Sequence, residues 1–477
     1  MNQKKYNLYF YNLMKSVTHF FYFLFFIFSF IISTTIFSGC AQIGAPTGGA
    51  KDTIPPTLIK ATPILRATNF TGNKITLEFD EYIDVQDLQK NLIVSPYPKT
   101  NPVVDFRLKL VTVKLKDTLF PNTTYTINFG NAIRDNNEGN PFENFSYVFS
   151  TGSTIDSLQI SGKVFLAESG KVDSTLQVML YSNADDSSVH KRKPDYLTNL
   201  KSDGTFAFAN LPPKNFEIYV LQDGDGSKTY NSPTEVFAFL NQGVQAAIFP
   251  DSVTLYAYAE EKPLEKKGAT PKSIAEKKLR YVTNVAGSTH DLLANVEIDF
   301  NNPLKKWDET KIRLTDTSFI NIPNVQFIID STQRKIQLKS NWKESTPYAL
   351  IIDKESVSDS TDLKLSKTDT ILFVTKRSSD YGTLALKFSS IPEGAHPVLQ
   401  FVQENKIVKS IPVTSNSWSD KLFPPGEYEL RILYDENGNG TWDPGNFYLK
   451  KQPEKVITLD SKLNIKANWD TERDIQL

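Results

Sequence analysis

Apolar and polar residues alternate along much of this chain. In "KITLEF", residues 74–79, the three apolar side chains would lie on one side of an extended strand and the polar side chains on the other. The segment "VTVKLKD", residues 111–117, has the same period of two. A strand with one apolar face needs a second sheet to cover that face. The pattern therefore predicts an all-β fold of antiparallel β-sandwiches, each of about 100 residues.

Composition supports several such sandwiches. The chain has 477 residues with 20 Tyr, 32 Phe and 26 Pro, which favours strands over helices. This length is too great for a single core, so we expect several domains. The formal net charge of −1 gives no basic footprint for binding nucleic acid.

Two segments of the chain recur later in the sequence. The segment "LPPKNFEIYVLQDGDGSKTY" (Leu211–Tyr230) aligns without a gap with "FPPGEYELRILYDENGNGTW" (Phe423–Trp442). A weaker pair is formed by "ITLEFDEYID" (Ile75–Asp84) and "VEIDFNNPLK" (Val296–Lys305). The units therefore follow one another in the order A, B, A′, B′. We predict unit A over residues 51–152, unit B over 153–260, a charged linker over 261–278, unit A′ over 279–376 and unit B′ over 377–477.

The N-terminal forty residues have the pattern of an export signal. Three lysines and an apolar run, Phe20–Phe37, occur in residues 1–39, which contain no acidic residue. Two interpretations fit. Residues 1–39 are a cleaved signal peptide, or they remain as a membrane anchor, because the apolar run is almost long enough to span a bilayer. Cys40 is the only cysteine and follows the run directly, which favours cleavage and excludes a disulfide within the chain.

The sequence Ser38-Gly39-Cys40 resembles a bacterial lipobox, with Phe37 where that pattern usually has Leu. The resemblance implies cleavage before Cys40 and three acyl chains on this cysteine, palmitate among them. Two or more chains anchor a protein stably, so the mature protein should stay on a membrane. Residues 40–50 would then form a lipidated flexible tether, "CAQIGAPTGGA". The absence of an acidic residue after Cys40 predicts an outer-membrane lipoprotein that faces the periplasm rather than the cell surface.

Unit A resembles a known family through three segments. They are "KDTIPPTLIKATP" (Lys51–Pro63), "NTTYTINFGNAIRDNNEGNP" (Asn122–Pro141) and "YVFSTG" (Tyr147–Gly152). These segments are similar to the bacterial Ig-like domain first described in S-layer proteins. With the lipobox, the chain resembles Ig-like lipoproteins of Bacteroidetes-type bacteria. Unit A′ lacks the Pro-Pro opening and the Asn-Asn-Glu-Gly loop, so we interpret it as a divergent Ig-like domain.

Units B and B′ resemble transthyretin-like or collagen-adhesin B-type sandwiches. The pattern that carries this resemblance in unit B is Gly204, Phe206, Phe208 and "NLPP" at residues 210–213. These resemblances imply a fold and a location but no reaction. Tyr125 of unit A and Tyr348 of unit A′ are similar to the tyrosine corner of Ig-like sandwiches, in which a phenol hydroxyl pins a loop, so we expect both to be structural.

The recurring segment of unit B′ ends in a loop, "YDENGNGTWDPGN", that suits two roles. With Asp435 as position 1 of a calcium loop, side chains follow at positions 3, 5 and 9, a backbone carbonyl at 7 and Gly440 at 6. The predicted ligands of this weak calcium site are Asp435, Asn437, Asn439, Thr441 and Asp443. Asn446 stands at position 12, where a bidentate Glu is usual. The alternative is a tight turn between two strands, which favours the same Asx and Gly residues.

The corresponding loop of unit B is a weaker candidate for a metal. Lys228 stands in place of Gly440 and brings a positive charge beside Asp223 and Asp225. We therefore interpret the unit B loop mainly as a turn, and calcium is the one cofactor that the sequence raises.

The sequence gives no sign of an enzyme. His190, His290 and His396 are isolated from one another, and the H-E-x-x-H, G-x-S-x-G and phosphate-binding glycine motifs are missing. The carboxylates of Asp80 and Glu81 follow a predicted strand, but acidic pairs at strand ends are common in exposed loops. We predict no catalytic residue and no enzymatic activity.

Three non-enzymatic hypotheses remain. The protein is a structural spacer of the cell envelope, or an adhesin-like module that binds glycan or protein, or an accessory subunit of an outer-membrane complex. Aromatic residues such as Trp418, Tyr434 and Trp442 would serve the second role, although such residues also close the ends of cores. Glycan arrays would separate the second hypothesis from the others, and co-purification from membranes the third. The predicted partners are the membrane, through the lipid, and an envelope protein or glycan, but no nucleic acid.

Overall fold

The computed structural model describes residues 14–15, 17–27, 51–182, 185–262, 278–285, 289–389, 391, 394 and 396–477. Residues 14–15 and 17–27 are helical. Within the described residues, no helix has both the length and the apolar character needed to cross a membrane. Cys40, the predicted tether up to residue 50 and most of the predicted linker lie outside the described residues. The remainder forms β-sandwich units, so the all-β prediction is confirmed.

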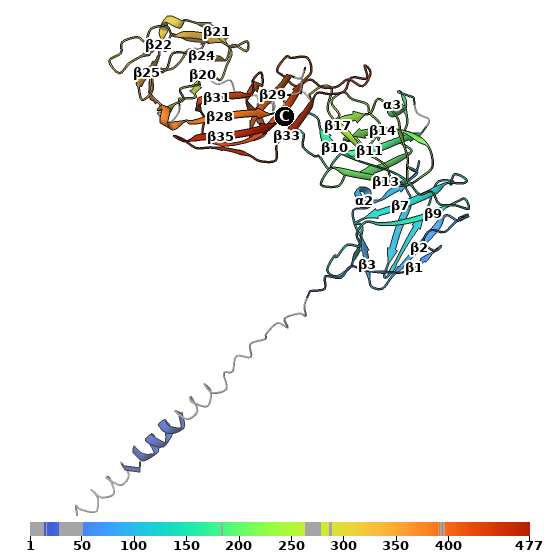
Figure 1. The fold of residues 1–477 in the computed structure, drawn as a ribbon. Helices are drawn as coiled ribbons and strands as arrows, with labels where there is room; N and C mark the ends of the chain where they lie inside the picture. Colours follow the sequence, from blue (N-terminus) through green and yellow to red (C-terminus); the bar gives the residue numbers. More distant parts are fainter. Residues whose placement is uncertain are drawn as a thin grey trace, which may run out of the picture.

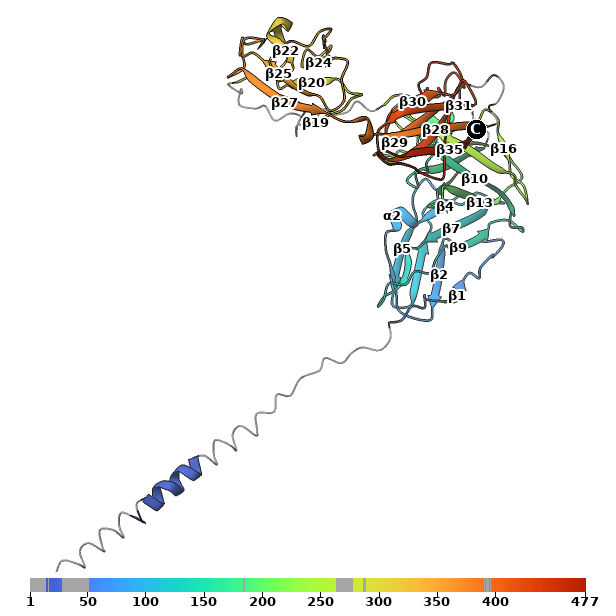
Figure 2. The same cartoon turned by 60° about the vertical axis from the view of Figure 1, so that its left-hand side comes forward.

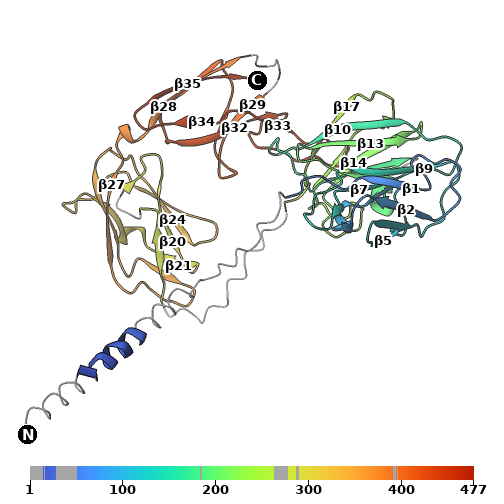
Figure 3. The same ribbon diagram turned by 90° about the horizontal axis from the view of Figure 1, so that it is seen from below.

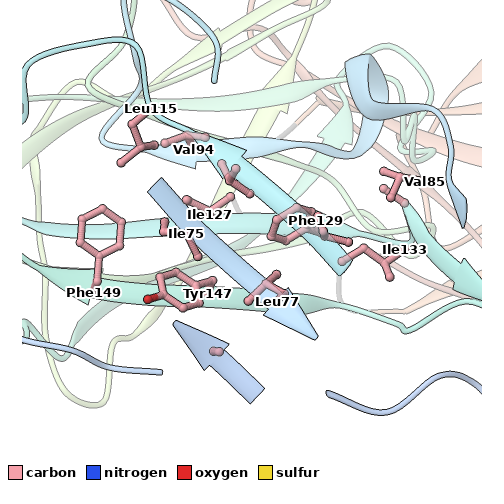
Figure 4. Packing of buried hydrophobic residues seen from close by; sticks show 14 of the residues in the cluster. Ile75, Leu77, Val85, Val94, Leu115, Ile127, Phe129, Ile133, Tyr147 and Phe149 are labelled. Atoms are coloured by element: carbon pink, nitrogen blue, oxygen red, sulfur yellow. The ribbon is translucent and has the colours of Figure 1, made fainter. Parts of the chain in front are cut away.

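Unit A is a sandwich of two main sheets. Its elements are β1 (Leu58–Thr62), β2 (Lys74–Phe79), β3 (Ile83–Val85), α2 (Leu88–Asn91), β4 (Ile93–Ser95), β5 (Val103–Arg107), β6 (Leu110–Lys114), β7 (Thr124–Gly130), β8 (Ile133–Asp135) and β9 (Phe145–Ser150). The sheets have the strand orders β1-β2-β6-β5 and β4-β7-β9, and β3 pairs with β8. The alternation in β2 is confirmed, because Ile75, Leu77 and Phe79 are buried in the core between the sheets. Figure 4 shows Ile75 and Leu77 in this core with Ile127 and Phe129 of β7.

Unit B has a different sandwich topology. Its elements are β10 (Leu158–Leu166), β11 (Gln177–Ser182), α3 (Ser188–Lys191), β12 (Tyr196–Asn199), β13 (Thr205–Leu211), β14 (Asn215–Leu221), β15 (Phe237–Phe239), β16 (Val244–Gln245) and β17 (Ser252–Ala257). One sheet has the order β13-β10-β17, and the other has β12-β11-β14-β15 with β16 on β14. The first and last strands, β10 and β17, pair in parallel.

Unit A′ has the strand order of unit A. Its elements are β18 (Tyr281–Thr283), β19 (Thr289–His290), β20 (Val296–Phe300), β21 (Leu304–Trp307), η1 (Glu309–Lys311), β22 (Ile312–Thr315), β23 (Gln326–Ile329), β24 (Lys335–Lys339), β25 (Pro347–Ile352), β26 (Val357–Asp359) and β27 (Asp369–Thr375). The sheets β18-β20-β24-β23 and β22-β25-β27-β19 correspond to the two sheets of unit A, with β19 as an additional edge strand that pairs in parallel with β27, and β21 pairs with β26 as β3 does with β8.

Unit B′ has the strand order of unit B. Its elements are η2 (Ser378–Asp380), β28 (Gly382–Ser389), β29 (His396–Gln403), β30 (Lys406–Pro412), β31 (Ser417–Phe423), β32 (Gly426–Asp435), β33 (Lys455–Thr458), β34 (Leu463–Ile465) and β35 (Asp470–Gln476). Its sheets are β31-β28-β35 and β30-β29-β32-β33, with β34 on β32. Again the first and last strands of the unit, β28 and β35, pair in parallel.

The two corner tyrosines act as the sequence predicts. The hydroxyl of Tyr125 accepts a hydrogen bond of 2.8 Å from the backbone N–H of Phe120. The hydroxyl of Tyr348 accepts one of 3.3 Å from the N–H of Lys343. Each phenol therefore pins the loop that leads into its own strand, and the structural role is confirmed.

The order of the units in space differs from their order in the sequence. Unit B′ lies between unit B and unit A′, so the spatial order is A, B, B′, A′ (Figure 1). Figure 2 shows the same order after rotation, and Figure 3, seen from below, again shows unit B′ between unit A′ and the overlapping units A and B. Unit A′ contacts unit B′ through a hydrogen bond of 2.8 Å from the N–H of Leu292 to the hydroxyl of Tyr381. Because units B and B′ are separated by about 100 residues of unit A′, their contact requires specific docking residues.

Candidate functional site

The loop of unit B′ is closed by its own side chains. The carboxylate of Asp435, buried at the end of β32, accepts hydrogen bonds from the N–H groups of Gly438 at 2.7 Å and Gly440 at 2.6 Å. The amide groups of Asn437 and Asn439 both donate to the carboxylate of Asp443. All four side chains thus have partners within the loop, which is the arrangement that the turn alternative predicts.

A residue beyond the loop completes this arrangement. Glu454 is buried and accepts hydrogen bonds of 2.9 Å from the N–H groups of both Glu436 and Asp443. Its backbone carbonyl accepts a bond of 2.8 Å from the indole N–H of Trp442. Glu454 therefore holds both ends of the loop, although it lies outside the motif that the sequence identifies.

In unit B a lysine takes the place that a cation would need. The Nζ of Lys228 lies 2.5 Å from the carboxylate of Asp223 and 2.8 Å from the side-chain oxygen of Gln177. Asn231 donates to Asp225 at 2.8 Å, so this loop has the same amide-to-carboxylate bond as unit B′ with the two partners exchanged. The charge of Asp223 is therefore balanced by a lysine of the same loop, as the substitution at the glycine position suggests.

The ionisation of Asp435 fits a turn that is stable at neutral pH. Burial raises the pKa of this carboxyl group, but hydrogen bonds from the backbone N–H groups of residues 437–440 together lower it further than burial raises it. Its pKa therefore lies below the usual value, and the group stays ionised. Among the described residues, no group of three or more His, Cys, Asp or Glu side chains is placed to hold a metal ion. Calcium binding by the Asp435 loop stays a prediction.

Replacing Asp435 with alanine tests the loop. In calcium-free buffer we expect Asp435→Ala to lower the unfolding free energy of unit B′ by about 1.5–3 kcal/mol, because two N–H groups lose a charged acceptor. Thermal unfolding measures this loss, and Glu436→Ala, an exposed neighbour, should change stability by less than about 0.5 kcal/mol. An unchanged melting temperature in Asp435→Ala would contradict the role. The same assay with millimolar calcium tests the metal, since only a binding loop would be stabilised by the ion.

The segment that follows this loop docks onto unit B. We call residues Asp443–Glu454 the docking segment. It has 11 residues between Asp443 and β33, where the corresponding connection of unit B has five between Asn231 and β15. The ring of Phe447 is 1% exposed and lies among aromatic residues of unit B. This set, which we call the socket, consists of His190, Tyr219, Tyr230, Phe237 and Phe239.

The geometry of the socket is specific for an aromatic ring. The ring of Phe447 meets Phe237 and Phe239 edge-on, with centroids 5.3 and 5.2 Å away. Such edge-to-face pairs are favourable beyond the area that they bury. The Nζ of Lys450 lies 4.3 Å from the centroid of the Phe447 ring and 2.5 Å from the carboxylate of Asp186 in unit B.

Polar contacts fix the backbone of the docking segment. Glu260 accepts hydrogen bonds from the N–H of Phe447 at 2.9 Å and from the amide of Asn446 at 3.1 Å. The amide of Gln452 donates to the carbonyl of Phe239 at 3.1 Å. Farther along the interface, the Nζ of Lys171 lies 2.9 Å from the carboxylate of Glu429. Units B and B′ are therefore joined by a specific interface.

This interface is not evident from the sequence. Phe447 stands in a polar stretch, "DPGNFYLKKQPE", in which an aromatic residue has no periodic partner. The one hint in the sequence is a difference in length. The connection that follows the loop is longer in unit B′ than in unit B, and this longer connection is the one that docks. Trp418, Tyr434 and Trp442, which the sequence raises as ligand contacts, are all partly buried and pack against cores.

A groove lies between units A and B. It has a volume of about 910 Å³ and is lined by segments 94–102, 115–121 and 192–195 together with Tyr125. Phe120 is exposed at its wall, and Lys99, Lys116 and Lys193 are exposed around it. Units A and B meet beside it through a hydrogen bond of 2.7 Å from the N–H of Tyr97 to the carbonyl of Asp195.

Comparison with known proteins identifies part of the chain. Residues 52–151 match the family described as bacterial Ig-like domain. The chain matches none of the curated proteins with which it was compared. Among solved structures, it is similar to BcpA, the major pilin subunit of Bacillus cereus, with 12% identity over 67% of this chain and 99% of the pilin, at a TM-score of 0.16. A second similar structure is the N-terminal part of the bacterial S-layer protein SbsC, with 16% identity over 35% of this chain and 40% of that one, at a TM-score of 0.16.

The structural similarities are too low to carry an argument about function. The family match agrees with the resemblance that the sequence of unit A shows, and it covers that unit alone. Residues 52–151 are therefore similar to the bacterial Ig-like domain family, within an all-β chain of sandwich units.

Proposed function

We propose that this protein is a non-catalytic structural lipoprotein of the cell envelope, of the kind found in Bacteroidetes-type bacteria. Acyl chains on Cys40 hold it in the outer membrane, on the periplasmic face, and its sandwich units act as a spacer. The observation that carries the proposal is the interface between units B and B′, centred on Phe447 in the socket. Units joined only by linkers would behave as independent beads, whereas docked units can hold a defined distance.

Side-chain contacts at the other two junctions between units also support this role. Unit A is joined to unit B through a hydrogen bond of 2.9 Å from the N–H of Asp156 to the hydroxyl of Thr124. Unit A′ is joined to unit B′ by a hydrogen bond of 2.7 Å from the N–H of Ser378 to the carboxylate of Glu344, in addition to the Tyr381 contact. Each junction thus has side-chain contacts as well as a covalent connection. A spacer needs this property.

Lipid anchoring is tested by replacing Cys40 with serine. We expect wild-type protein to float with outer-membrane vesicles and Cys40→Ser to appear in the soluble fraction or as unprocessed precursor, because a serine cannot carry the thioether-linked lipid. Mass spectrometry of the mature N-terminus should find three acyl chains. As a control, Ser38→Ala keeps a small residue before the cysteine and should be processed normally. Wild-type protein that keeps residues 1–39 and carries no acyl chain on Cys40 would instead support the uncleaved anchor.

A second candidate function is ligand binding in the groove between units A and B. Its exposed Phe120 and three exposed lysines suit an acidic glycan, which presents both apolar sugar faces and negative charge. The acids that line the groove are already engaged, Asp117 with the N–H of Thr100 at 3.0 Å and Asp195 with Arg192 at 2.9 Å. Glycan arrays probed with wild type and Phe120→Ala distinguish this candidate from a spacer without ligand. Membrane pulldown would likewise identify a partner complex.

A further inference from the structure

The hairpin between β5 and β6 ends in an exposed apolar tip. We define the tip as Phe106–Leu110, "FRLKL", in which Phe106, Leu108 and Leu110 are all exposed, Leu108 to 63%. Leu108 has a φ of +55°, in the left-handed region that glycine and asparagine adopt more easily than leucine. A large apolar side chain therefore stands in solvent at a backbone position that does not favour it. The packing of unit A does not account for this leucine.

The tip lies at the end of unit A where the chain enters. Thr57, which precedes β1, donates to the carboxylate of Asp80 through its N–H at 2.8 Å and its hydroxyl at 2.5 Å. The N–H of Phe79, next to Asp80, donates to the carbonyl of Lys109 in the tip at 2.9 Å. The segment that leads from residue 51 into the sandwich is therefore a neighbour of the tip. Ile54, 67% exposed, extends the apolar surface at this end.

The tip also points away from the rest of the protein. Strand β6 leads from Leu110 to Lys114, and residues 115–121, which follow it, line the groove beside unit B. Five residues of strand place the tip about 17 Å from the groove end. In Figure 2, the segment that precedes β1 enters unit A at the end farthest from unit B.

The length of chain before unit A limits how far this end can be from a lipid. Eleven residue steps separate Cys40 from Lys51, and a fully extended chain of that length reaches about 40 Å at most. With acyl chains on Cys40, the entry end of unit A therefore stays within one domain length of the bilayer. The tip is the exposed apolar feature that this end offers to the membrane surface.

Charge at this end does not select for acidic lipids. Arg107 and Lys109 of the tip are positive, but Asp52, Asp80 and Glu81 lie at the same end. Asp135 and Glu138 also lie near Glu81, so acids outnumber the two bases of the tip and binding would depend on the apolar side chains. Phenylalanine and leucine partition into the boundary between headgroups and acyl chains, while arginine and lysine keep their charged ends at headgroup level.

We propose that the tip Phe106–Leu110 inserts into the surface of the phospholipid bilayer that holds the lipid anchor. This inference rests on the lipid anchoring proposed above and adds a second contact beside the acyl chains. Two contacts at one end of unit A fix the orientation of the whole array relative to the membrane, which a single tether does not do. The tether raises the effective concentration of the tip at the surface, so even a weak tip is held there.

A fluorescent label beside the tip tests insertion. Because Cys40 is the only native cysteine and is blocked by lipid, Arg107→Cys gives a single reactive thiol in the full-length lipoprotein. In phosphatidylcholine vesicles we expect a polarity-sensitive dye at this site to shift to the blue and to be quenched at least twofold by nitroxide-bearing lipid. A dye at Thr118→Cys, exposed at the opposite end of β6, should show neither effect. Raising the salt concentration to 0.5 M should leave the quenching unchanged.

The variant Leu108→Asn provides the decisive comparison. Asparagine suits a positive φ, so the hairpin should fold at least as well as in wild type, while the apolar side chain is lost. In the Arg107→Cys background we expect this change, combined with Phe106→Thr, to abolish the quenching although the protein still floats with the vesicles. If the labelled Arg107→Cys protein, which keeps Phe106 and Leu108, floats with the vesicles but its dye is not quenched, the tip proposal is wrong and lipid anchoring is unaffected. Failure of the wild type to float would overturn the anchoring proposal and the tip proposal with it.

Discussion

Phe447→Ala is expected to release unit B′ from unit B. The ring is buried in the socket of unit B, and removing a buried phenylalanine typically costs about 3–5 kcal/mol. Without the buried ring, the docking segment is no longer held against unit B, so the hydrogen bonds that Glu260 accepts from it should also weaken. We expect an increase in the radius of gyration measured by small-angle X-ray scattering, and new protease cleavage within residues 443–454.

A neighbouring residue supplies the matched control. Leu449 belongs to the same docking segment but is 78% exposed, so Leu449→Ala should leave both the scattering curve and the cleavage pattern unchanged. If Phe447→Ala kept the dimensions and protease resistance of the wild type, the interface would not hold the two units together. The proposed spacer would then lose its main support.

The fold followed from the sequence where local patterns decide it. The period of two in residues 74–79 is enough to place Ile75, Leu77 and Phe79 in a core, because a strand in a sandwich can bury only every second residue. The aligned segments 211–230 and 423–442 both occupy the stretch from β13 to the loop after β14, or from β31 to the loop after β32. Patterns of this kind depend on neighbours in sequence and in the same sheet.

The spatial order of the units could not be predicted in the same way. This order depends on the packing of Phe447, a residue of a mainly polar loop, against the socket of unit B. The sequence around Phe447 is typical of an exposed connection. The role of Glu454 was missed for a related reason, since a lone glutamate before a strand is usually solvated, yet here it accepts two backbone N–H groups. By contrast, the effect of Lys228 was foreseeable, because a charge that replaces a glycine acts on its immediate neighbours.

Gly162→Ala is expected to destabilise unit B strongly. Gly162 lies in the central strand β10, and a Cβ at this position would stand 2.1 Å from the carbonyl oxygen of Val253 and 2.7 Å from the ring of Phe206. The carbonyl belongs to the paired strand β17 and cannot move without breaking the ladder. We therefore expect a loss of about 3 kcal/mol or more in the unfolding free energy of this unit.

The consequence should extend to the whole array, because unit B contacts both unit A and unit B′. With unit B unfolded, limited proteolysis of Gly162→Ala should release unit A separately from the pair B′ and A′, and the scattering profile should become that of separate bodies. Gly224→Ala is the control, since a Cβ there meets no atom within 4 Å and should change stability by less than about 0.5 kcal/mol. Equal melting temperatures for the two variants would show that β10 and β17 tolerate a wider spacing, and that unit B is not the element on which the array depends.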